Sequence, residues 1–263
     1  MMSLNSDGAA APPEGSVGDR SRSRWTWRSG RPRAPLTAAR LLRRFVQIGL
    51  GLILLWVGAV FWLGLLYWAV PPVSTLMLGR WLTLQPVARD FVRLDEISPN
   101  LPLAVLTAED NRFCEHHGVD WGALWMVMES ADGDGPARGA STIPMQVAKN
   151  LFLWPSRSYL RKGLEIPVAL YLDLIWSKRQ TMEVYLNIAE WGEGVFGAEA
   201  ASQKYFRKPA KNLTRQEAAL LARALPNPLV RNPARPRPGH RALAGQLMAR
   251  MERAAPFSDC LKP

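Results

Sequence analysis

One uninterrupted apolar segment constrains this chain more than any other feature. Residues 45–70 read FVQIGLGLILLWVGAVFWLGLLYWAV, where Gln47 is the only strongly polar side chain and no residue is charged. A helix needs about 20 apolar residues to cross a hydrocarbon layer of about 30 Å, and tryptophan and tyrosine near its far end suit the membrane interface. A cleaved signal peptide has an apolar core of only about 7 to 15 residues. The segment therefore predicts a transmembrane helix that stays in the protein as an anchor.

Arginines in the preceding segment predict the orientation of this anchor. Residues 1–44 contain nine arginines, no lysine and three acids. Basic residues beside a transmembrane helix stay on the cytoplasmic side, so the N-terminus is expected in the cytoplasm. Residues 5–38 hold too few apolar side chains to form a core. We therefore expect a disordered basic tail over 1–44, a single-pass anchor over 45–70 and an exported domain over 71–263.

The net charge of +11 raises the question of nucleic acid. Nine of the 33 lysines and arginines lie in the tail, where the membrane orientation explains them. An exported domain rarely meets DNA, and a basic surface beside anionic lipid suits a lipid or phosphate substrate. The charge therefore favours an anionic lipid-linked substrate over nucleic acid.

Helical patterns dominate the exported part. Apolar residues recur with the helical period over residues 158–189, where a bend or break is expected at Pro167. Thr214 and Glu217 have the spacing of a capping box before another helix. Residues 130–139, SADGDGPARG, predict a loop. Alternating strand patterns are almost absent, so the predicted fold class is mostly α-helical.

The chain has two cysteines, Cys114 and Cys260. They could pair in an oxidising compartment, but nothing in their spacing predicts a disulfide. We expect both thiols to be free, with Cys114 packed as a small hydrophobic side chain.

The segment TAEDNRFCEHHGVDWGAL, residues 107–124, places acids, an arginine, a phenylalanine and two histidines directly after the apolar run LPLAVL. The plainest interpretation is the end of an amphipathic helix, on which Glu109 and Arg112 form a solvated i, i+3 pair. A functional interpretation depends on the blocks that follow.

Five blocks occur in order between about residues 100 and 235: EDNRFCEHHG, GASTIPMQVAKNLF, RKGLE, SKRQTMEVYLNIAEWG and AALLARALPNP. Together they resemble the family 51 glycosyltransferases, which polymerise peptidoglycan, and the single anchor is similar to that of the monofunctional members. The penicillin-binding motifs S-x-x-K and K-T-G do not occur, so no transpeptidase activity is expected. The resemblance implies one transmembrane helix in the cell inner membrane and a lysozyme-like, α-helical glycosyltransferase domain in the periplasm.

The resemblance also implies a reaction. The donor is a glycan chain linked through an α-pyrophosphate to a polyprenyl lipid, and the acceptor is a sugar 4-hydroxyl of lipid II. Transfer inverts the donor anomeric carbon, makes a β-1,4 bond and releases polyprenyl diphosphate. A sugar hydroxyl needs a base to remove its proton, and Glu109 matches the family's base. Its place at the end of an apolar run predicts a pKa raised by burial.

Cations of the second and third blocks complete the implied site. Lys149 and Arg157 match family positions that hold the pyrophosphate, and Arg161 and Lys162 add charge beside them. Such groups stabilise the charge that develops on a leaving diphosphate. Glu165 matches a second acidic position of the family and is expected to orient this cluster or a divalent cation. The alternative is an ordinary solvated basic helix turn.

Cofactors and partners follow from the same resemblance. It implies no required cofactor and leaves open a Mg or Mn ion near the pyrophosphate. Lipid II, the polyprenyl-linked glycan chain and the membrane are the expected partners, and cell-wall synthase or division proteins are left open.

Three polar residues of the second block, Ser141, Thr142 and Gln146, match positions that contact substrate. A helix N-cap explains Ser141 and Thr142 equally well. The family usually has Gln-Gln where this chain has Met145 and Gln146, preceded by Pro144. We therefore expect one substrate hydrogen bond fewer.

Several residues beside Glu109 allow two interpretations. Asp110 and Arg112 either hold the base through hydrogen bonds or are ordinary helix-end charges. His116 and His117 suggest a metal, but neighbours on a helix diverge and no acidic spacing completes a zinc set, so His116 is interpreted as structural. Two aromatic residues are interpreted as core rather than as sugar platforms, Phe113 and Tyr185.

Two other functions stay open at this point. A lysozyme-like hydrolase would use a protonated glutamate as its acid and would not need cations for a pyrophosphate. A non-catalytic, membrane-anchored scaffold would need neither Glu109 nor Lys149.

Overall fold

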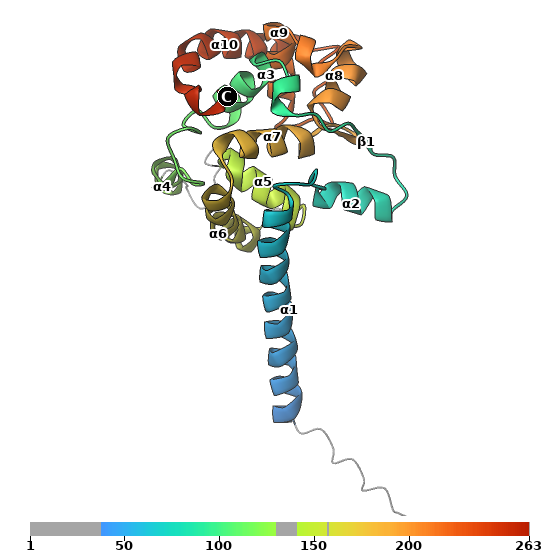
Figure 1. The fold of residues 1–263 in the computed structure, drawn as a ribbon, viewed down its shortest axis with the longest axis vertical. Coiled ribbons are helices and arrows are strands. Elements are labelled where there is room, and N and C mark those ends of the chain that lie inside the picture. Colours follow the sequence, from blue (N-terminus) through green and yellow to red (C-terminus); the bar gives the residue numbers. More distant parts are fainter. Residues whose placement is uncertain (1–37, 130–140, 157, 263) are drawn as a thin grey trace, which may run out of the picture. The chain divides into compact units, whose positions relative to one another are not determined.

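The computed structural model describes residues 38–129, 141–156 and 158–262 (Figure 1). Most of the predicted tail, the loop predicted over residues 130–139 and Arg157 lie outside these residues. The chain divides into two compact units, Met1–Gly49 and Leu50–Pro263.

The predicted anchor is helix α1, Ala38–Leu66, which is long and apolar enough to cross a membrane. It begins before the predicted 45–70 segment, and residues 38–44 are helical, which corrects the prediction of a disordered tail there. The extension follows from the sequence AARLLRR, because alanine, leucine and arginine are strong helix formers. The helix ends earlier than predicted because Pro71 and Pro72 follow, and residues before a proline disfavour helical angles.

The unit from Leu50 onward is mostly helical, as the sequence predicts. After α1 its α-helices are α2 (Thr75–Leu82), α3 (Asn100–Glu109), α4 (Trp121–Glu129), α5 (Ile143–Phe152), α6 (Tyr159–Ile175), α7 (Lys178–Ile188), α8 (Ala198–Phe206), α9 (Arg215–Ala224) and α10 (Pro238–Ala254). Four 3-10 helices are described: η1 (Leu94–Glu96), η2 (Ala210–Asn212), η3 (Ala255–Phe257) and η4 (Asp259–Leu261). The strands β1 (Ala88–Arg89), β2 (Glu190–Gly192) and β3 (Val195–Phe196) form one small sheet in the order β1-β3-β2. β1 is parallel to β3, and β2 is antiparallel to β3.

Side-chain caps start several of these helices. The Thr142 hydroxyl accepts a hydrogen bond from the backbone N–H of Met145 at the start of α5, which confirms the predicted cap. Thr214 and Glu217 form the predicted capping box at the start of α9. Ser177 caps α7 in the same way. Each cap satisfies a backbone N–H that has no partner inside the helix.

A bend or a break was predicted at Pro167; helix α6 continues through Pro167, so a break there is wrong. A proline ring removes one helical hydrogen bond and crowds the carbonyl four residues earlier. After Pro167 the helix is held by buried Val168, Ala169 and Leu172, and α6 packs against α5. This packing compensates for the lost hydrogen bond, and Glu165 stays on a continuous helix.

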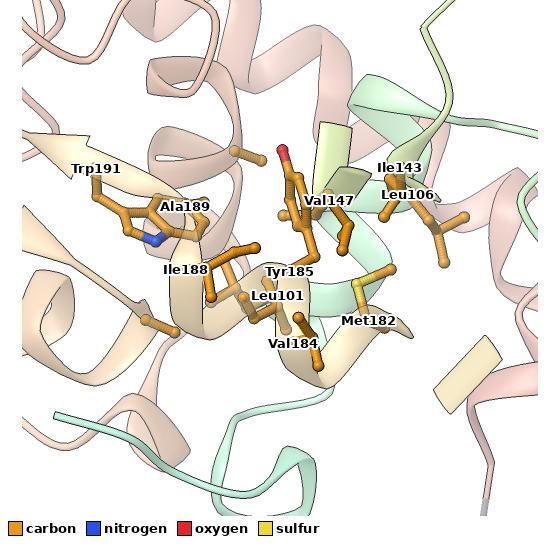
Figure 2. Packing of buried hydrophobic residues seen from close by; sticks show 14 of the residues in the cluster. Leu101, Leu106, Ile143, Val147, Met182, Val184, Tyr185, Ile188, Ala189 and Trp191 are labelled. Carbon is orange, nitrogen blue, oxygen red and sulfur yellow. The ribbon is translucent and has the colours of Figure 1, made fainter. Parts of the chain in front are cut away.

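Helix α7 contributes to the centre of one hydrophobic cluster (Figure 2). Its side chains Met182, Tyr185 and Leu186 are almost fully buried. Helix α5 packs on α6 and α7, while α3 packs on α9 and α10. The core therefore fixes α3, α5 and α6, the helices that carry the predicted site residues.

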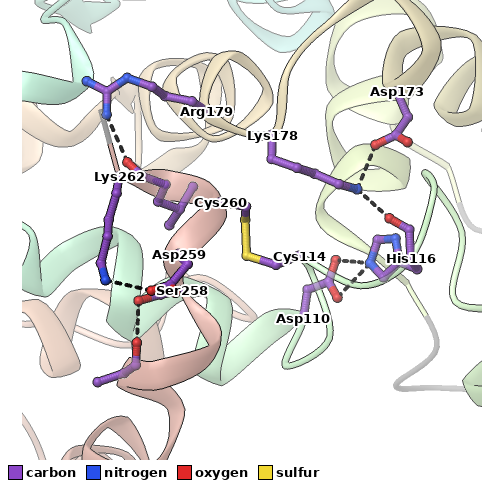
Figure 3. The surroundings of a disulfide bond; sticks show 12 residues. Asp110, Cys114, His116, Asp173, Lys178, Arg179, Ser258, Asp259, Cys260 and Lys262 are labelled. Carbon is purple, nitrogen blue, oxygen red and sulfur yellow. Dashed lines mark hydrogen bonds and ion pairs between the residues drawn. A yellow bond between two sulfur atoms is a disulfide. The ribbon is translucent and has the colours of Figure 1, made fainter.

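The two cysteines form a disulfide, so the prediction of free thiols is wrong (Figure 3). Cys114 lies in the turn after α3, Cys260 lies in η4, and their Cα atoms are 5.6 Å apart. They are separated by 146 residues, so tertiary packing, which includes that of η4 on α7, brings them together. The bond ties the C-terminal segment to the turn that follows the predicted base.

Gly118 fixes the path of the chain between α3 and α4. Its φ is +78°, a conformation that favours glycine, and an added Cβ would lie 2.8 Å from the carbonyl oxygen of Ala169. Its own carbonyl accepts a hydrogen bond of 2.6 Å from the Thr142 hydroxyl. This close contact holds the turn against α6 and against the start of α5.

Candidate active site

Glu109 is the last residue of α3, and its side chain is half-buried. Gln146 on α5 donates a hydrogen bond from Nε2 to Glu109 Oε2, over 3.3 Å. Burial raises the pKa of Glu109, and the Gln146 hydrogen bond together with the charges of Arg223 and Lys149 offsets only part of that effect. The direction agrees with the sequence prediction and suits a carboxylate that must take a proton near working pH.

The solvated pair between Glu109 and Arg112 is not formed. The Arg112 side chain instead lies 2.8 Å from Glu115 and 3.3 Å from Asp120. Helix α3 ends at Glu109, so Arg112 is not on the same helix face. Of the two interpretations of Arg112, these contacts favour an ordinary charge after the helix end, and the plain i, i+3 pair with Glu109 is wrong.

Asp110 is buried and joins the end of α3 to the start of α5 (Figure 3). Both of its carboxylate oxygens lie 2.9 Å from His116 Nε2, and Oδ2 accepts a hydrogen bond of 2.8 Å from the backbone N–H of Ile143. The backbone carbonyl of His116 accepts a hydrogen bond from Lys178 Nζ at 2.5 Å. These contacts are consistent with the structural interpretation of His116, and Asp110 fixes the chain directly after the predicted base.

Phe113 is buried in the core beneath Lys178, whose Nζ lies 5.1 Å from the ring centroid. This position confirms the core interpretation and leaves no ring face for a sugar. Tyr185 is also buried, but its hydroxyl donates to Gln146 Oε1 over 3.0 Å. The sequence interpretation missed this contact.

The polar residues at the start of α5 have different roles. The Thr142 hydroxyl caps the helix and donates to Gly118, so both of its hydrogen-bonding functions are used within the protein. Ser141 Oγ accepts a hydrogen bond from Lys162 Nζ, which brings Ser141 into the group of cations. Pro144 and Met145 are buried, so neither presents a side chain to substrate. Of the polar residues predicted to contact substrate, Ser141 and Gln146 therefore lie beside the charged groups.

The cations meet around a cavity of about 290 Å³ between α2, α5 and the start of α6. Lys149 and Arg161 line it together with Thr75, Trp154 and Ser156. Such a mixture of cations and an exposed aromatic ring suits an anionic group that carries an apolar chain. The cavity therefore places two of the predicted pyrophosphate ligands at one site.

Glu165 is the buried counter-charge of this cluster, with a residue exposure of 3%. Its carboxylate forms an ion pair with Arg161 and a second with Lys162 at 3.3 Å. Burial lowers the pKa of Lys162 to about 8, and the neighbouring charges of Arg161 and Lys149 act in the same direction. Burial also lowers the pKa of Lys149, and Arg161 adds to that effect. One carboxylate thus faces several cations, and a bound anion would stabilise the excess positive charge.

A resident divalent metal does not fit this donor set. Both ion-pair partners of Glu165 are cations, which would repel a metal ion. Within residues 38–129, 141–156 and 158–262, no group of three or more His, Cys, Asp or Glu could hold one. No step of the chemistry is therefore assigned to a metal.

Two arginines near the base were missed by the sequence interpretation. The charges of Arg223 and Arg231 both lower the pKa of Glu109, and Arg231 donates a hydrogen bond to the Arg223 backbone carbonyl. Arg223 is the only charged residue in the block AALLARALPNP, and this charge was the available signal. Together with Lys149 they offset part of the rise that burial causes in the pKa of Glu109.

Comparisons with known proteins identify the family of this chain. The sequence model of the Transglycosylase family matches residues 77–252. The chain is 52% identical over 193 residues to the biosynthetic peptidoglycan transglycosylase of Brucella suis biovar 1 (strain 1330), covering 73% of this chain and 86% of that protein. It is 48% identical over 221 residues to the protein of the same name from Rhodopseudomonas palustris (strain HaA2), covering 83% of this chain and 97% of the relative. The match includes the helices that carry Glu109, Lys149 and Glu165, and the chain belongs to the transglycosylase family.

Proposed function

We propose that the protein polymerises lipid II into β-1,4-linked glycan strands and releases polyprenyl diphosphate. As a family member it is a peptidoglycan glycosyltransferase. One observation supports the proposal of this particular reaction. A half-buried carboxylate, Glu109, lies within the electrostatic range of Lys149, which lines the same cavity as Arg161.

In the proposed step the ionised Glu109 carboxylate takes the proton from the 4-hydroxyl of lipid II. The 4-oxygen then forms a bond to the anomeric carbon of the donor sugar, while the bond from that carbon to the diphosphate oxygen breaks. Attack from the face opposite the leaving group inverts the anomeric carbon. The electron pair of the broken bond stays on the polyprenyl diphosphate, and the proton on Glu109 passes to solvent.

The cations act on the leaving group. Lys149 and Arg161 line the cavity, and Lys162 lies beside them through its contacts with Ser141 and Glu165. Positioned charges stabilise the negative charge that grows on the diphosphate, and this effect can exceed that of the base. Arg157 is proposed as a further ligand on the strength of its sequence position alone.

One feature argues against retaining glycan hydrolysis. A retaining hydrolase needs a second carboxylate as nucleophile, and the Glu165 carboxylate is paired with two cations. The arrangement suits transfer from a diphosphate better than cleavage between sugars.

Product analysis tests this function. Purified full-length protein is incubated in detergent with labelled lipid II and, separately, with finished peptidoglycan, and the products are separated on gels. We expect new, uncross-linked glycan strands from lipid II and no shortening of finished strands. Shortened strands without new polymer would contradict the proposal and favour a hydrolase. A protein that changes neither substrate would favour a scaffold.

We also propose that the N-terminus is cytoplasmic and the glycosyltransferase domain periplasmic. The nine arginines before the anchor support this orientation, and so does the Cys114–Cys260 disulfide, because such bonds persist in oxidising compartments. A reporter that needs disulfides to be active, fused after Pro263, should work in intact cells. The same reporter should be inactive when fused before Met1. The opposite pattern would contradict the orientation and the access to exported lipid II.

A further inference from the structure

A chain of two hydrogen bonds reaches from the protein core to the proposed base. Tyr185, in the middle of α7, donates from its hydroxyl to Gln146 Oε1 over 3.0 Å. Gln146, on α5, donates from Nε2 to Glu109 Oε2 over 3.3 Å. Three helices, α7, α5 and α3, are thereby joined through side chains at the carboxylate.

Chemistry fixes the direction of this chain. An ionised carboxylate only accepts hydrogen bonds, so Gln146 must turn its amide NH₂ group toward Glu109. The amide oxygen then faces Tyr185, and two acceptors cannot pair, so the phenol must donate. Burial raises the pKa of Tyr185 well above its ordinary value, and the charges of Glu109 and Asp110 act in the same direction. The phenol therefore keeps the proton that the chain requires.

The core holds the Tyr185 ring in place. Its residue exposure is 1%, and Figure 2 shows the ring rising from α7 beside Val147, with the hydroxyl at the far end. Gln146 is only half-buried, and an amide can turn by 180° at little steric cost. Without the tyrosine hydroxyl, the amide could present its oxygen to the carboxylate and repel it.

We propose that Tyr185 is a positioning residue, which acts through Gln146 to hold Glu109 in place and in its ionised form. The proposal rests on the proposed function in one respect, the role of Glu109 as base. Tyr185 itself is buried and is not expected to touch substrate. Its effect should appear as a change in the titration and alignment of Glu109.

The first variant is Tyr185→Phe, which removes one oxygen atom and keeps the ring. Loss of a buried hydrogen bond of ordinary strength should lower kcat about 3- to 10-fold, with a smaller change in KM. The acid limb of the pH profile of kcat/KM should move to higher pH, because the flipped amide no longer favours the ionised base. Tyr205→Phe is the matched control, because the Tyr205 hydroxyl donates to the Trp191 carbonyl instead. It should leave the profile unchanged.

A double-mutant cycle separates positioning from packing. In the Gln146→Leu background the chain is already broken, so adding Tyr185→Phe should change kcat by less than about 2-fold. If Tyr185 mattered only for packing, Tyr185→Phe would lower kcat by the same factor in the wild type and in Gln146→Leu. That result would overturn the proposal. Gln146→Leu alone leaves the buried aromatic core intact and should also move the acid limb upward. If the acid limb of kcat/KM in Gln146→Leu stayed at the wild-type pH, that result would also overturn the proposal.

A titration without substrate keeps this test independent of the proposed function. The side-chain carboxyl carbons of glutamate are ¹³C-labelled in the full-length protein in detergent, and the Glu109 signal is assigned by its loss in Glu109→Gln. We expect the pKa of Glu109 to rise in Tyr185→Phe and in Gln146→Leu, but not in Tyr205→Phe. Unchanged titration in both chain variants would overturn the hydrogen-bond chain. A shifted titration in a protein that makes no polymer would support the chain and contradict the function.

Discussion

The Asp110 carboxylate lies 2.9 Å from Nε2 of His116, and both side chains are buried. The same carboxylate accepts the backbone N–H of Ile143, the first residue of α5. Asp110 directly follows Glu109, and α5 carries Gln146 and Lys149. One buried side chain therefore sets the position of α5 relative to the base.

Removing this link should lower stability. Asp110→Ala leaves the Ile143 N–H and the His116 ring without their buried acceptor, which should cost about 1 to 3 kcal/mol in the free energy of unfolding. Urea unfolding of the protein in detergent measures the change. Asp259→Ala is the matched control, because the Asp259–Lys262 pair is about 70% exposed on both sides. It should stay within about 0.5 kcal/mol of the wild type, and equal losses in the two variants would contradict the buried link.

Glu109→Gln should preserve stability while it removes the proposed base. The pKa of Glu109 is raised in the folded protein, so the folded state holds the proton more tightly than the unfolded state. The ionised carboxylate therefore costs stability as the pH rises through the folded pKa, and a neutral amide avoids this cost. At pH 7 the variant should be at least as stable as the wild type in thermal unfolding. A marked loss of stability would show that Glu109 has a structural role.

Loss of the Lys162 charge should lower kcat/KM at high pH and so produce the basic limb of the activity profile. Its pKa is lowered to about 8, so the charge that we propose faces the diphosphate is lost as the pH rises through that value. In Lys162→Arg the charge persists, and the basic limb of kcat/KM should move to higher pH. Lys211→Arg, at an exposed site, is the control and should not move it. An identical basic limb in the wild type and in Lys162→Arg would contradict this role.

The pH dependence that Lys162 gives to stability is opposite to the one it gives to activity. The folded state binds fewer protons at Lys162 than the unfolded state between the folded pKa of about 8 and the ordinary value of 10.5. The contribution of Lys162 to stability therefore rises over this window, while activity falls.

The disulfide should contribute strongly to stability. Cys114 and Cys260 close a loop of 146 residues, and the Cys114→Ala, Cys260→Ala double variant should lose about 2 to 5 kcal/mol in the free energy of unfolding. A reductant should destabilise the wild type and leave the double variant unchanged. Wild-type protein that unfolds at the same urea concentration with and without reductant would contradict the bridge.

Local features of the fold could be predicted because their causes are local. The caps at Thr142 and Thr214 and the apolar run of α1 involve neighbours in sequence. Helix continuity through Pro167 could not be predicted, because packing of the later half of α6 compensates for the lost hydrogen bond. The prediction of free thiols was wrong for a related reason, since Cys114 and Cys260 are 146 residues apart and meet through tertiary packing, which includes that of η4 on α7.

In the candidate site, too, features with a sequence signal were predicted and features that depend on tertiary packing were not. Glu109, Lys149 and Glu165 were predicted from their sequence blocks; α5 packs on α6, and hydrogen bonds of Gln146 and Ile143 join α5 to the end of α3. The Glu109–Arg112 pair was wrong because α3 ends between them, a boundary that the apolar pattern does not define. Tyr185 was read correctly as core, but its contact with Gln146 joins two helices and has no sequence signal.

Polymerisation of lipid II by the wild type and by Glu109→Gln tests the central claim most directly. Both proteins are purified in full length, shown to be folded by thermal unfolding, and incubated with labelled lipid II under identical conditions. We expect the wild type to make glycan strands and the variant to make them at least about 100-fold more slowly, the loss typical of a positioned general base. A folded Glu109→Gln variant that polymerises lipid II at a rate near that of the wild type would contradict the account.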